Sequence, residues 1–134
     1  MNPVLMAIAA GAGFVARAFS GDQKHLTEIM KQAIEYPGYA LVDILQPCVT
    51  FNKVNTFAYY KSRVYHIDDE HDPSNQIEAM KLAMEFDEKI PIGVIYREEK
   101  ESFHQKNKIL AGREPLVDRK RESSVINDLI NEFV

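Results

Sequence analysis

Cys48 is the residue of this sequence with the widest range of possible chemistry. It is the single cysteine of the chain, and it follows Pro47 shortly after the apolar run Tyr39–Leu45. A thiolate at this place could act as a nucleophile, a redox thiol or a metal ligand, and a small buried apolar residue is the alternative. A single cysteine excludes an internal disulfide framework and a zinc site built from several cysteines of this chain. It fits a reducing compartment.

The histidines add no recognisable motif to this cysteine. A cysteine nucleophile needs a base, and no known motif ties Cys48 to any of the four histidines, which are His25, His66, His71 and His104. His66 and His71 flank an acidic run, but no known metal-ligand spacing fits, so we interpret this run as a solvated loop. Gly11 and Gly13 follow a predicted helix instead of a strand, so they do not form a dinucleotide-binding loop.

The composition is that of an ordinary globular protein. The chain has 134 residues, 46% of them hydrophobic and 27% charged, which fits one domain. Sixteen basic against twenty acidic residues give a net charge of −4, and this balance argues against a nucleic-acid partner. The uncharged stretch Met1–Ala16 has no basic residue before it and is shorter than the roughly 20 residues of a spanning helix. The sequence therefore predicts a soluble, cytoplasmic protein without a membrane partner.

The first half of the chain has the pattern of a strand–helix–strand unit. Asn2-Pro3 is typical of a helix start, so we expect a short apolar helix over Val4–Ala10 and then a buried strand over Phe14–Ala18. After a cap at Asp22, apolar residues recur at helical spacing, namely Leu26, Ile29, Met30, Ala33 and Ile34. The strand Tyr39–Leu45 follows. This order predicts an α/β fold with a partial doubly wound parallel sheet and flanking helices. Residues 46–52 would then lie at the carboxyl end of a parallel strand, where such sheets bind ligands.

The second half is less regular. We expect Asn55-Thr56 to cap a short aromatic helix, and Asp72 or Ser74 to cap a helix that buries Ile77, Met80, Ala83 and Met84. Ile90–Tyr96 is predicted to be a third strand, with Pro91 at its first position or at a sheet edge. The polar segment Arg97–Arg121 predicts an extended tail. A last helix, capped by Ser123 or Ser124, would carry Val125, Ile126, Leu129, Ile130 and Phe133 on one face.

Several blocks of the sequence together resemble one family. The most specific block is Leu41–Asn52, which reads Leu-Val-Asp-Ile-Leu-Gln-Pro-Cys-Val-Thr-Phe-Asn. The others are Asn2-Pro3 with Ala9–Arg17, Asp22 with Lys24–Leu26, His71–Ser74 and Ile90–Tyr96. Their order and spacing resemble the β subunit of 2-oxoacid:ferredoxin oxidoreductases. The resemblance implies the C-terminal part of a thiamine-diphosphate-binding α/β domain over residues 1–100. Residues 101–134 would form a C-terminal tail that packs against other subunits.

The resemblance also implies an activity and a set of cofactors. These enzymes oxidatively decarboxylate a 2-oxoacid to an acyl-CoA and pass electrons to ferredoxin, and the 2-oxoglutarate type is favoured here. Their cofactors are thiamine diphosphate, Mg²⁺ and a [4Fe–4S] cluster. Cys48 maps onto the fourth cysteine ligand of that cluster. Thr50 and Asn52 would lie beside this ligand and adjust the reduction potential of the cluster, and Phe51 would shield the cluster from water. The expected partners are an α subunit, the N-terminal part of the β subunit, ferredoxin and coenzyme A.

The sequence departs from the family pattern in ways that bear on activity. It starts about halfway along the family's β subunit, and it lacks both the diphosphate-binding Gly-Asp-Gly motif and the other three cluster cysteines. We therefore expect this chain alone to be inactive, and no residue is predicted to be catalytic. The alternative is a truncated remnant or a non-catalytic interaction module that self-associates into a homo-oligomer. Its exposed apolar surface would include Val4, Leu5, Ile8, Phe57, Tyr59 and Tyr60.

Overall fold

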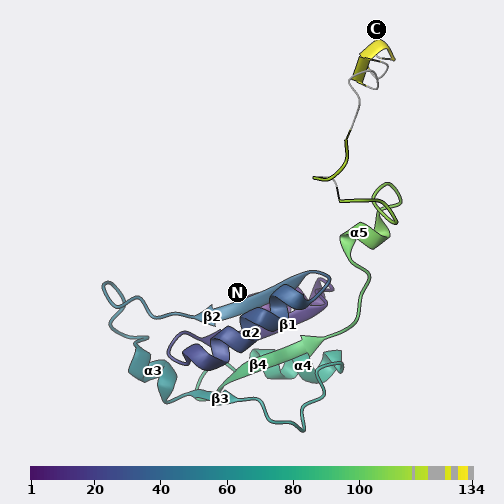
Figure 1. Ribbon diagram of the computed structural model, residues 1–134. Coiled ribbons are helices and arrows are strands. Elements are labelled where there is room, and N and C mark those ends of the chain that lie inside the picture. The colour runs from purple at the N-terminus through teal and green to yellow at the C-terminus, as the bar shows by residue number, and fades with distance from the viewer. Residues whose placement is uncertain (116, 121–125, 128–129, 133–134) are drawn as a thin grey trace. The chain divides into compact units, whose positions relative to one another are not determined.

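The strand β1 (Phe14–Phe19) is central, and all of its residues are buried. The computed structural model describes residues 1–115, 117–120, 126–127 and 130–132. Within these residues a four-stranded sheet has the order β2-β1-β4-β3, with β2 at Ala40–Leu45, β3 at Val64–His66 and β4 at Ile90–Arg97 (Figure 1). β1 runs parallel to β2, and β3 runs parallel to β4, but β1 and β4 are antiparallel. The sheet is therefore mixed, and the predicted parallel sheet is wrong.

The sheet consists of two strand–helix–strand units placed antiparallel to each other. The predicted unit, β1–α2–β2, forms with α2 at Gln23–Glu35. The second unit joins β3 to β4 through α4 (Gln76–Met84). The strand β3 was not predicted, because three residues before an acidic loop are too few to show a periodicity. An apolar run predicts a strand but not its direction, so the antiparallel contact of β1 with β4 carried no sequence signal.

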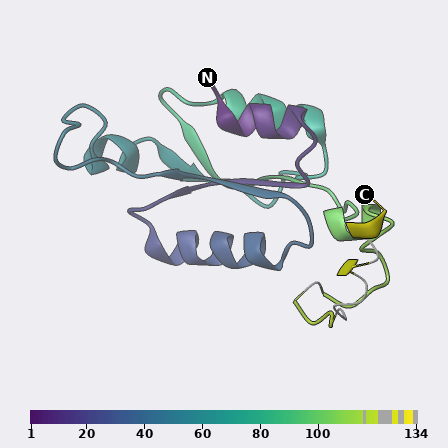
Figure 2. The same cartoon turned by 90° about the horizontal axis from the view of Figure 1, so that it is seen from above.

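Helices cover both faces of the sheet. α2 lies on one face, and α1 (Pro3–Ala9) and α4 lie on the other (Figure 2). Phe14, Ala16 and Ala18 pack toward α2 with Ile29 and Tyr36. Residue Val15 belongs to the cluster on the opposite face, together with Val4, Ile8, Ala79 and Ala83. Two covered faces explain why β1 is buried along its whole length and is apolar at every position except Arg17.

The predicted helix starts are confirmed at three of four sites. Asn2, Asp22 and Thr56 cap α1, α2 and α3 (Phe57–Lys61), each accepting a backbone N–H three residues on. The cap of α4 is Asn75, so the predicted caps Asp72 and Ser74 are wrong. The Asp72 carboxylate instead accepts bonds from the backbone N–H and hydroxyl of Ser74, forming a turn just before the helix.

Some residues expected in the core are exposed, and some residues expected at the surface are buried. Ile77 and Met84 were expected inward but are 62% and 60% exposed, and Met30 and Ile34 of α2 are also exposed. On α4 the contact with α1 is made instead by small residues, Ala79 and Ala83, which allow the two helices to approach closely. The apolar surface predicted for self-association is partly wrong as well, because Val4 and Ile8 are fully buried. Phe57 is exposed, and Leu5, Tyr59 and Tyr60 are half-buried.

Pro91 lies in a central strand and not at an edge. Ile90 N donates to Arg63 O at 2.9 Å, and Ile92 O accepts from Ile67 N at 3.0 Å, so these neighbours make the bonds to the β3 side. The nitrogen of Pro91 therefore faces β1. The pairing of β1 with β4 ends at Gly93, so the missing N–H removes no bond from that ladder.

Arg17 is the buried charged residue of the described chain, and it ties three elements together. Its side chain is 1% exposed, and its Nε lies 3.0 Å from Asp43 Oδ2 on β2. Nη2 and Nη1 donate to the backbone oxygens of Ala83 and Glu85 at 3.3 Å and 3.4 Å. These carbonyls belong to the C-terminal end of α4, where they lack intrahelical partners and where a cation is favoured.

The chain divides into two compact units, Met1–Ser102 and Phe103–Val134. The second unit contains a helical turn, α5 (Phe103–Lys106), which was not predicted, followed by turns. Most of the predicted last helix, including Ser123, Ser124, Val125, Leu129 and Phe133, lies outside the described residues. Among the residues that are described, no helix is both long and apolar enough to cross a membrane.

Candidate functional site

Cys48 lies at the carboxyl end of the edge strand β2, where the sequence placed it. The thiol is exposed, and the backbone N–H groups of Phe51, Thr50 and Asn52 lie near it in the turn. These N–H groups lower the pKa of the Cys48 thiol below its ordinary value, because they favour the thiolate. The turn after β2 is therefore a small cradle of N–H groups around one sulfur atom.

The local sequence explains this turn. Pro47 is buried and restricts the backbone that enters the turn. Asn52 N then donates to Cys48 O at 3.1 Å, which closes the turn. The side-chain oxygen of Asn52 accepts from the N–H groups of Val54 and Asn55 at 2.9 Å each, so the Asn52 side chain supports the next turn of the loop.

The residues expected around Cys48 are close to it, but through their backbone. The backbone N–H groups of Thr50, Phe51 and Asn52 lower the pKa of the Cys48 thiol, while Phe51 itself is 89% exposed. A partner surface would have to cover that ring before it could exclude water from the thiol.

The donor set of this turn fits one corner of an iron–sulfur cluster. Soft thiolates bind iron well, and N–H groups directed at the sulfur are one means by which a protein tunes a cluster's potential. When bound, such a cluster supplies one-electron transfer. A [4Fe–4S] cluster needs four ligands, and Cys48 is the single cysteine of this chain, so the other three ligands would come from another polypeptide segment.

Histidines 66 and 71, which the sequence placed in one acidic loop, have separate environments. His71 Nε2 lies 2.8 Å from Ile95 O, whereas His66, at the end of β3, lies 3.0 Å from Asp22 Oδ2. The ring of His25 packs edge-on against His66 with 4.5 Å between centroids. Sequence reasoning missed this group because Asp22 and His66 are 44 positions apart.

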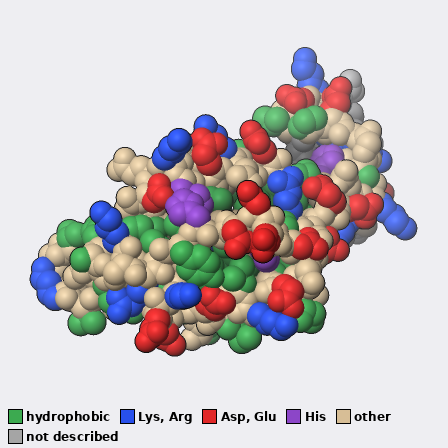
Figure 3. Space-filling view, turned by 90° about the horizontal axis from the view of Figure 1, so that it is seen from below, with side chains coloured by type: hydrophobic (Ala, Val, Ile, Leu, Met, Phe, Trp, Pro, Cys, Tyr) green, Lys and Arg blue, Asp and Glu red, His purple; other side chains and the backbone are tan. Residues whose placement is uncertain are grey.

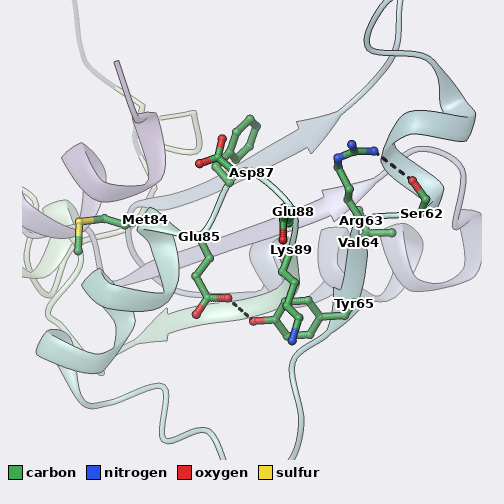
Figure 4. Close-up of a pocket in the computed structure, with 10 residues that line it drawn as sticks. Ser62, Arg63, Val64, Tyr65, Met84, Glu85, Asp87, Glu88 and Lys89 are labelled. Atoms are coloured by element: carbon green, nitrogen blue, oxygen red, sulfur yellow. Dashed lines mark hydrogen bonds between the residues drawn. The ribbon is translucent and has the colours of Figure 1, made fainter.

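A pocket of about 960 Å³ lies beside β3 and the connection between α4 and β4. The Tyr65 hydroxyl donates to Glu85 Oε2 at 2.8 Å on one side, and Arg63 donates to Ser62 Oγ at 3.1 Å on the other (Figure 4). Burial and the Glu85 carboxylate raise the pKa of Tyr65 to about 12. This pocket was not predicted from the sequence, because β3, which lines it, was not predicted either.

The face of the molecule that is drawn in Figure 3 carries charges of both signs. Acidic and basic side chains are interspersed over the face drawn in Figure 3, and no continuous basic stripe crosses it. This arrangement agrees with the net charge of −4.

Fold and site together define the chain as an α/β domain with a thiol site at the end of an edge strand. A family model described as the C-terminal part of the pyruvate ferredoxin oxidoreductase beta subunit matches residues 48–111, so the match begins at Cys48. A 2-oxoacid:ferredoxin oxidoreductase subunit beta from Saccharolobus solfataricus is 38% identical over 86% of the chain. Subunit beta of 2-oxoacid:ferredoxin oxidoreductase 1 from Aeropyrum pernix is 45% identical over 72% of the chain.

A solved structure agrees with these relatives. It is the 2-oxoglutarate:ferredoxin oxidoreductase from Magnetococcus marinus with 2-oxoglutarate, coenzyme A and succinyl-CoA bound, and it matches 76% of the chain with a TM-score of 0.73 and 39% identity. The chain belongs to the family of 2-oxoacid:ferredoxin oxidoreductase β subunits and corresponds to their C-terminal part. It spans 41% and 34% of the two relatives and 35% of the solved chain.

Proposed function

We propose that this chain forms the C-terminal part of a 2-oxoacid:ferredoxin oxidoreductase β subunit and contributes one thiolate ligand to its [4Fe–4S] cluster. The complete enzyme would convert a 2-oxoacid and coenzyme A into an acyl-CoA and CO₂ and pass the electrons to ferredoxin. The observation that carries the proposal is the exposed Cys48 thiol, whose pKa is lowered by three nearby backbone N–H groups, in a chain with relatives of 38–45% identity.

The backbone N–H groups of this turn suit the role of Cys48 as a cluster ligand. The three N–H groups lower the pKa of Cys48, so the thiolate that a cluster needs is favoured before any metal binds. After binding, the same groups would offset part of the negative charge on the cluster sulfur and so raise its reduction potential.

The proposed partners of this chain follow from the number of cluster ligands that it lacks. An N-terminal β-subunit segment would provide the remaining cluster ligands and the site for thiamine diphosphate and Mg²⁺. An α subunit would complete the assembly. The chain by itself would then have no oxidoreductase activity, and Thr50, Phe51 and Asn52 would form the polypeptide around the cluster ligand. We favour 2-oxoglutarate as the substrate, because the matching solved structure has 2-oxoglutarate bound.

A chimeric enzyme tests this proposal. The C-terminal part of the Saccharolobus β subunit is replaced by this chain and co-expressed with the α subunit of that enzyme. We expect CoA-dependent reduction of ferredoxin with 2-oxoglutarate or pyruvate, and we expect none from the isolated chain. Both substrates are assayed in parallel, so that activity is detected whichever of the two the host enzyme prefers.

Cys48→Ser in the chimera separates the cluster role from a packing role. We expect the variant to lose the low-temperature electron paramagnetic resonance signal of the reduced cluster and at least one iron per cluster. Val49→Ala is the matched control, because Val49 is an exposed neighbour in the same turn. A Cys48→Ser chimera that keeps full iron content, signal and activity would contradict the proposal.

A second candidate function, self-association, is supported by the edge of the sheet. The described pairing of β2 is with β1, so its other edge is unpaired among the described residues, and Ile44 there is exposed. An unpaired edge is a template for strand addition by a second copy. Size-exclusion chromatography with light scattering would detect a homo-oligomer, and a monomer at high concentration would exclude it.

A further inference from the structure

Asp22, His25 and His66 form a side-chain group that the cluster proposal does not use. One donor atom from each of the three lies within 4.8 Å of the other two. Asp22 is the cap of α2, His25 belongs to the first turn of that helix, and His66 ends β3. The group therefore joins the turn after β1 to a strand that follows it by more than forty residues.

The hydrogen bonding of the group leaves one ring nitrogen without a partner. Asp22 uses Oδ1 to accept the His25 backbone N–H at 3.2 Å, and its Oδ2 faces His66 Nε2 at 3.0 Å. His25 Nδ1 is buried and has no hydrogen-bond partner among the described residues. A buried ring nitrogen without a partner is costly, and a bound metal or proton donor would satisfy it.

The site is open to solution. The side chains of His66 and Asp22 are 59% and 36% exposed, so an ion can enter without any rearrangement of the fold. Asp22 also lines a pocket of about 560 Å³ with Phe19, Phe57 and Lys61, so space for a further ligand lies next to the group.

We propose that Asp22, His25 and His66 bind a divalent first-row transition metal such as Zn²⁺, which ties the start of α2 to the end of β3. Two imidazoles and one carboxylate are a ligand set that Zn²⁺ accepts, while Mg²⁺ and Ca²⁺ prefer oxygen ligands alone. Two donors bound to one tetrahedral Zn²⁺ at about 2.0–2.2 Å are about 3.3–3.6 Å apart, so side-chain movements of about 1 Å bring the three together.

The metal site is separate from the cluster ligand in its chemistry. The cluster site offers one soft thiolate, whereas this group offers nitrogen and oxygen donors, so each site can be tested without the other. The proposal does not depend on the oxidoreductase assignment.

Metal titration of the full chain tests the proposal. The chain carries Cys48→Ser, so that the exposed thiol does not bind the metal, and it has no histidine tag. Calorimetry with Zn²⁺ is expected to show one equivalent bound per chain, and Mg²⁺ is expected not to compete. Zn²⁺ should also raise the midpoint of thermal unfolding, because it binds the folded arrangement of two distant segments.

Ligand variants locate the ion. His25→Ala and His66→Ala are each expected to weaken Zn²⁺ binding by at least about tenfold, since changes around metal ligands already cost about that much. Asp22→Asn removes the anionic oxygen but retains a side chain that can cap α2, so it should weaken binding without loss of the helix. His104→Ala, in the second unit, is the matched control and should bind as the parent does.

Two results would overturn the proposal. One is the absence of stoichiometric Zn²⁺ binding by the folded parent, and the other is binding that neither histidine variant weakens. If a variant fails to fold, as judged by circular dichroism, X-ray absorption of the Zn²⁺-loaded parent decides the question. Two imidazole ligands support the site, and a spectrum without imidazole refutes it.

Discussion

Removing the carboxylate beside the buried Arg17 is expected to be among the most damaging single changes to this fold. In Asp43→Ala, the guanidinium keeps its bonds to the oxygens of Ala83 and Glu85, which are long at 3.3 Å and 3.4 Å. It loses the 3.0 Å bond to Asp43. The variant therefore leaves a positive charge in a site that is 1% exposed, without the anion that offsets it.

The size of the effect follows from the burial of the pair. Breaking a fully buried ion pair by removing one partner costs about 3–5 kcal/mol. The Asp43 side chain is 23% exposed, so water can reach the space that alanine leaves and recover part of the loss. We expect the free energy of unfolding to fall by about 2–3 kcal/mol.

Urea unfolding followed by circular dichroism measures this change. The control is Glu28→Ala, which breaks a 3.0 Å pair with Lys31 whose side chains are 57% and 60% exposed. Loss of an exposed pair of this kind should lower the free energy of unfolding by less than about 1 kcal/mol. A double variant, Arg17→Met with Asp43→Ala, should be more stable than Asp43→Ala alone, because it leaves no unpaired buried charge.

Two results would refute this reasoning. If Asp43→Ala lowers the free energy of unfolding no more than Glu28→Ala does, the Asp43 carboxylate does not offset the buried charge of Arg17. If the double variant is no more stable than Asp43→Ala alone, the loss arises from packing around β1 and not from the uncompensated charge.

Three further changes test other parts of the structure. Gly93→Ala should lower the free energy of unfolding by about 1–3 kcal/mol, because Gly93 has φ +140° and a Cβ there would lie 3.3 Å from Ile67; an unchanged urea midpoint would contradict this. Tyr65 should ionise near pH 12 by tyrosinate absorbance, and Glu85→Gln should bring that value down toward 10. The stabilisation of neutral Tyr65 is then fully present below about pH 10 and lost as the pH rises to about 12. The rate of Cys48 alkylation by iodoacetamide should reach half its maximum at a lower pH than for a free cysteine, and an equal or higher midpoint would show that the turn does not favour the thiolate.

Much of the local structure followed from short-range chemistry. Asn2, Asp22 and Thr56 cap their helices as predicted, because a cap needs only a side-chain oxygen three residues before an N–H group. The unit β1–α2–β2 also formed as expected, since the helix between two strands sets their parallel direction. The position of Cys48 after β2 could be predicted from the same local pattern.

The errors share a different cause. Pro91 was predicted at an edge or at the first position of its strand because it has no N–H. Which strands lie on the two sides of β4 is decided by the arrangement of the whole sheet. Ile77 and Met84 were assigned to the core from their spacing, but the contact of α4 with α1 uses Ala79 and Ala83 instead. Both mistakes concern contacts between elements, which hydrophobic spacing within one element does not encode.

The sequence by itself determined the α/β class, the first strand–helix–strand unit, the caps and the place of the thiol, because each of these depends on residues close together in the chain. Tertiary structure alone decided the antiparallel contact of β1 and β4, the burial of Arg17 against the end of α4, and the meeting of Asp22 and His25 with His66. The physical reason is that strand direction, charge burial and donor geometry depend on which distant surfaces pack together. No periodicity within a single segment carries that information.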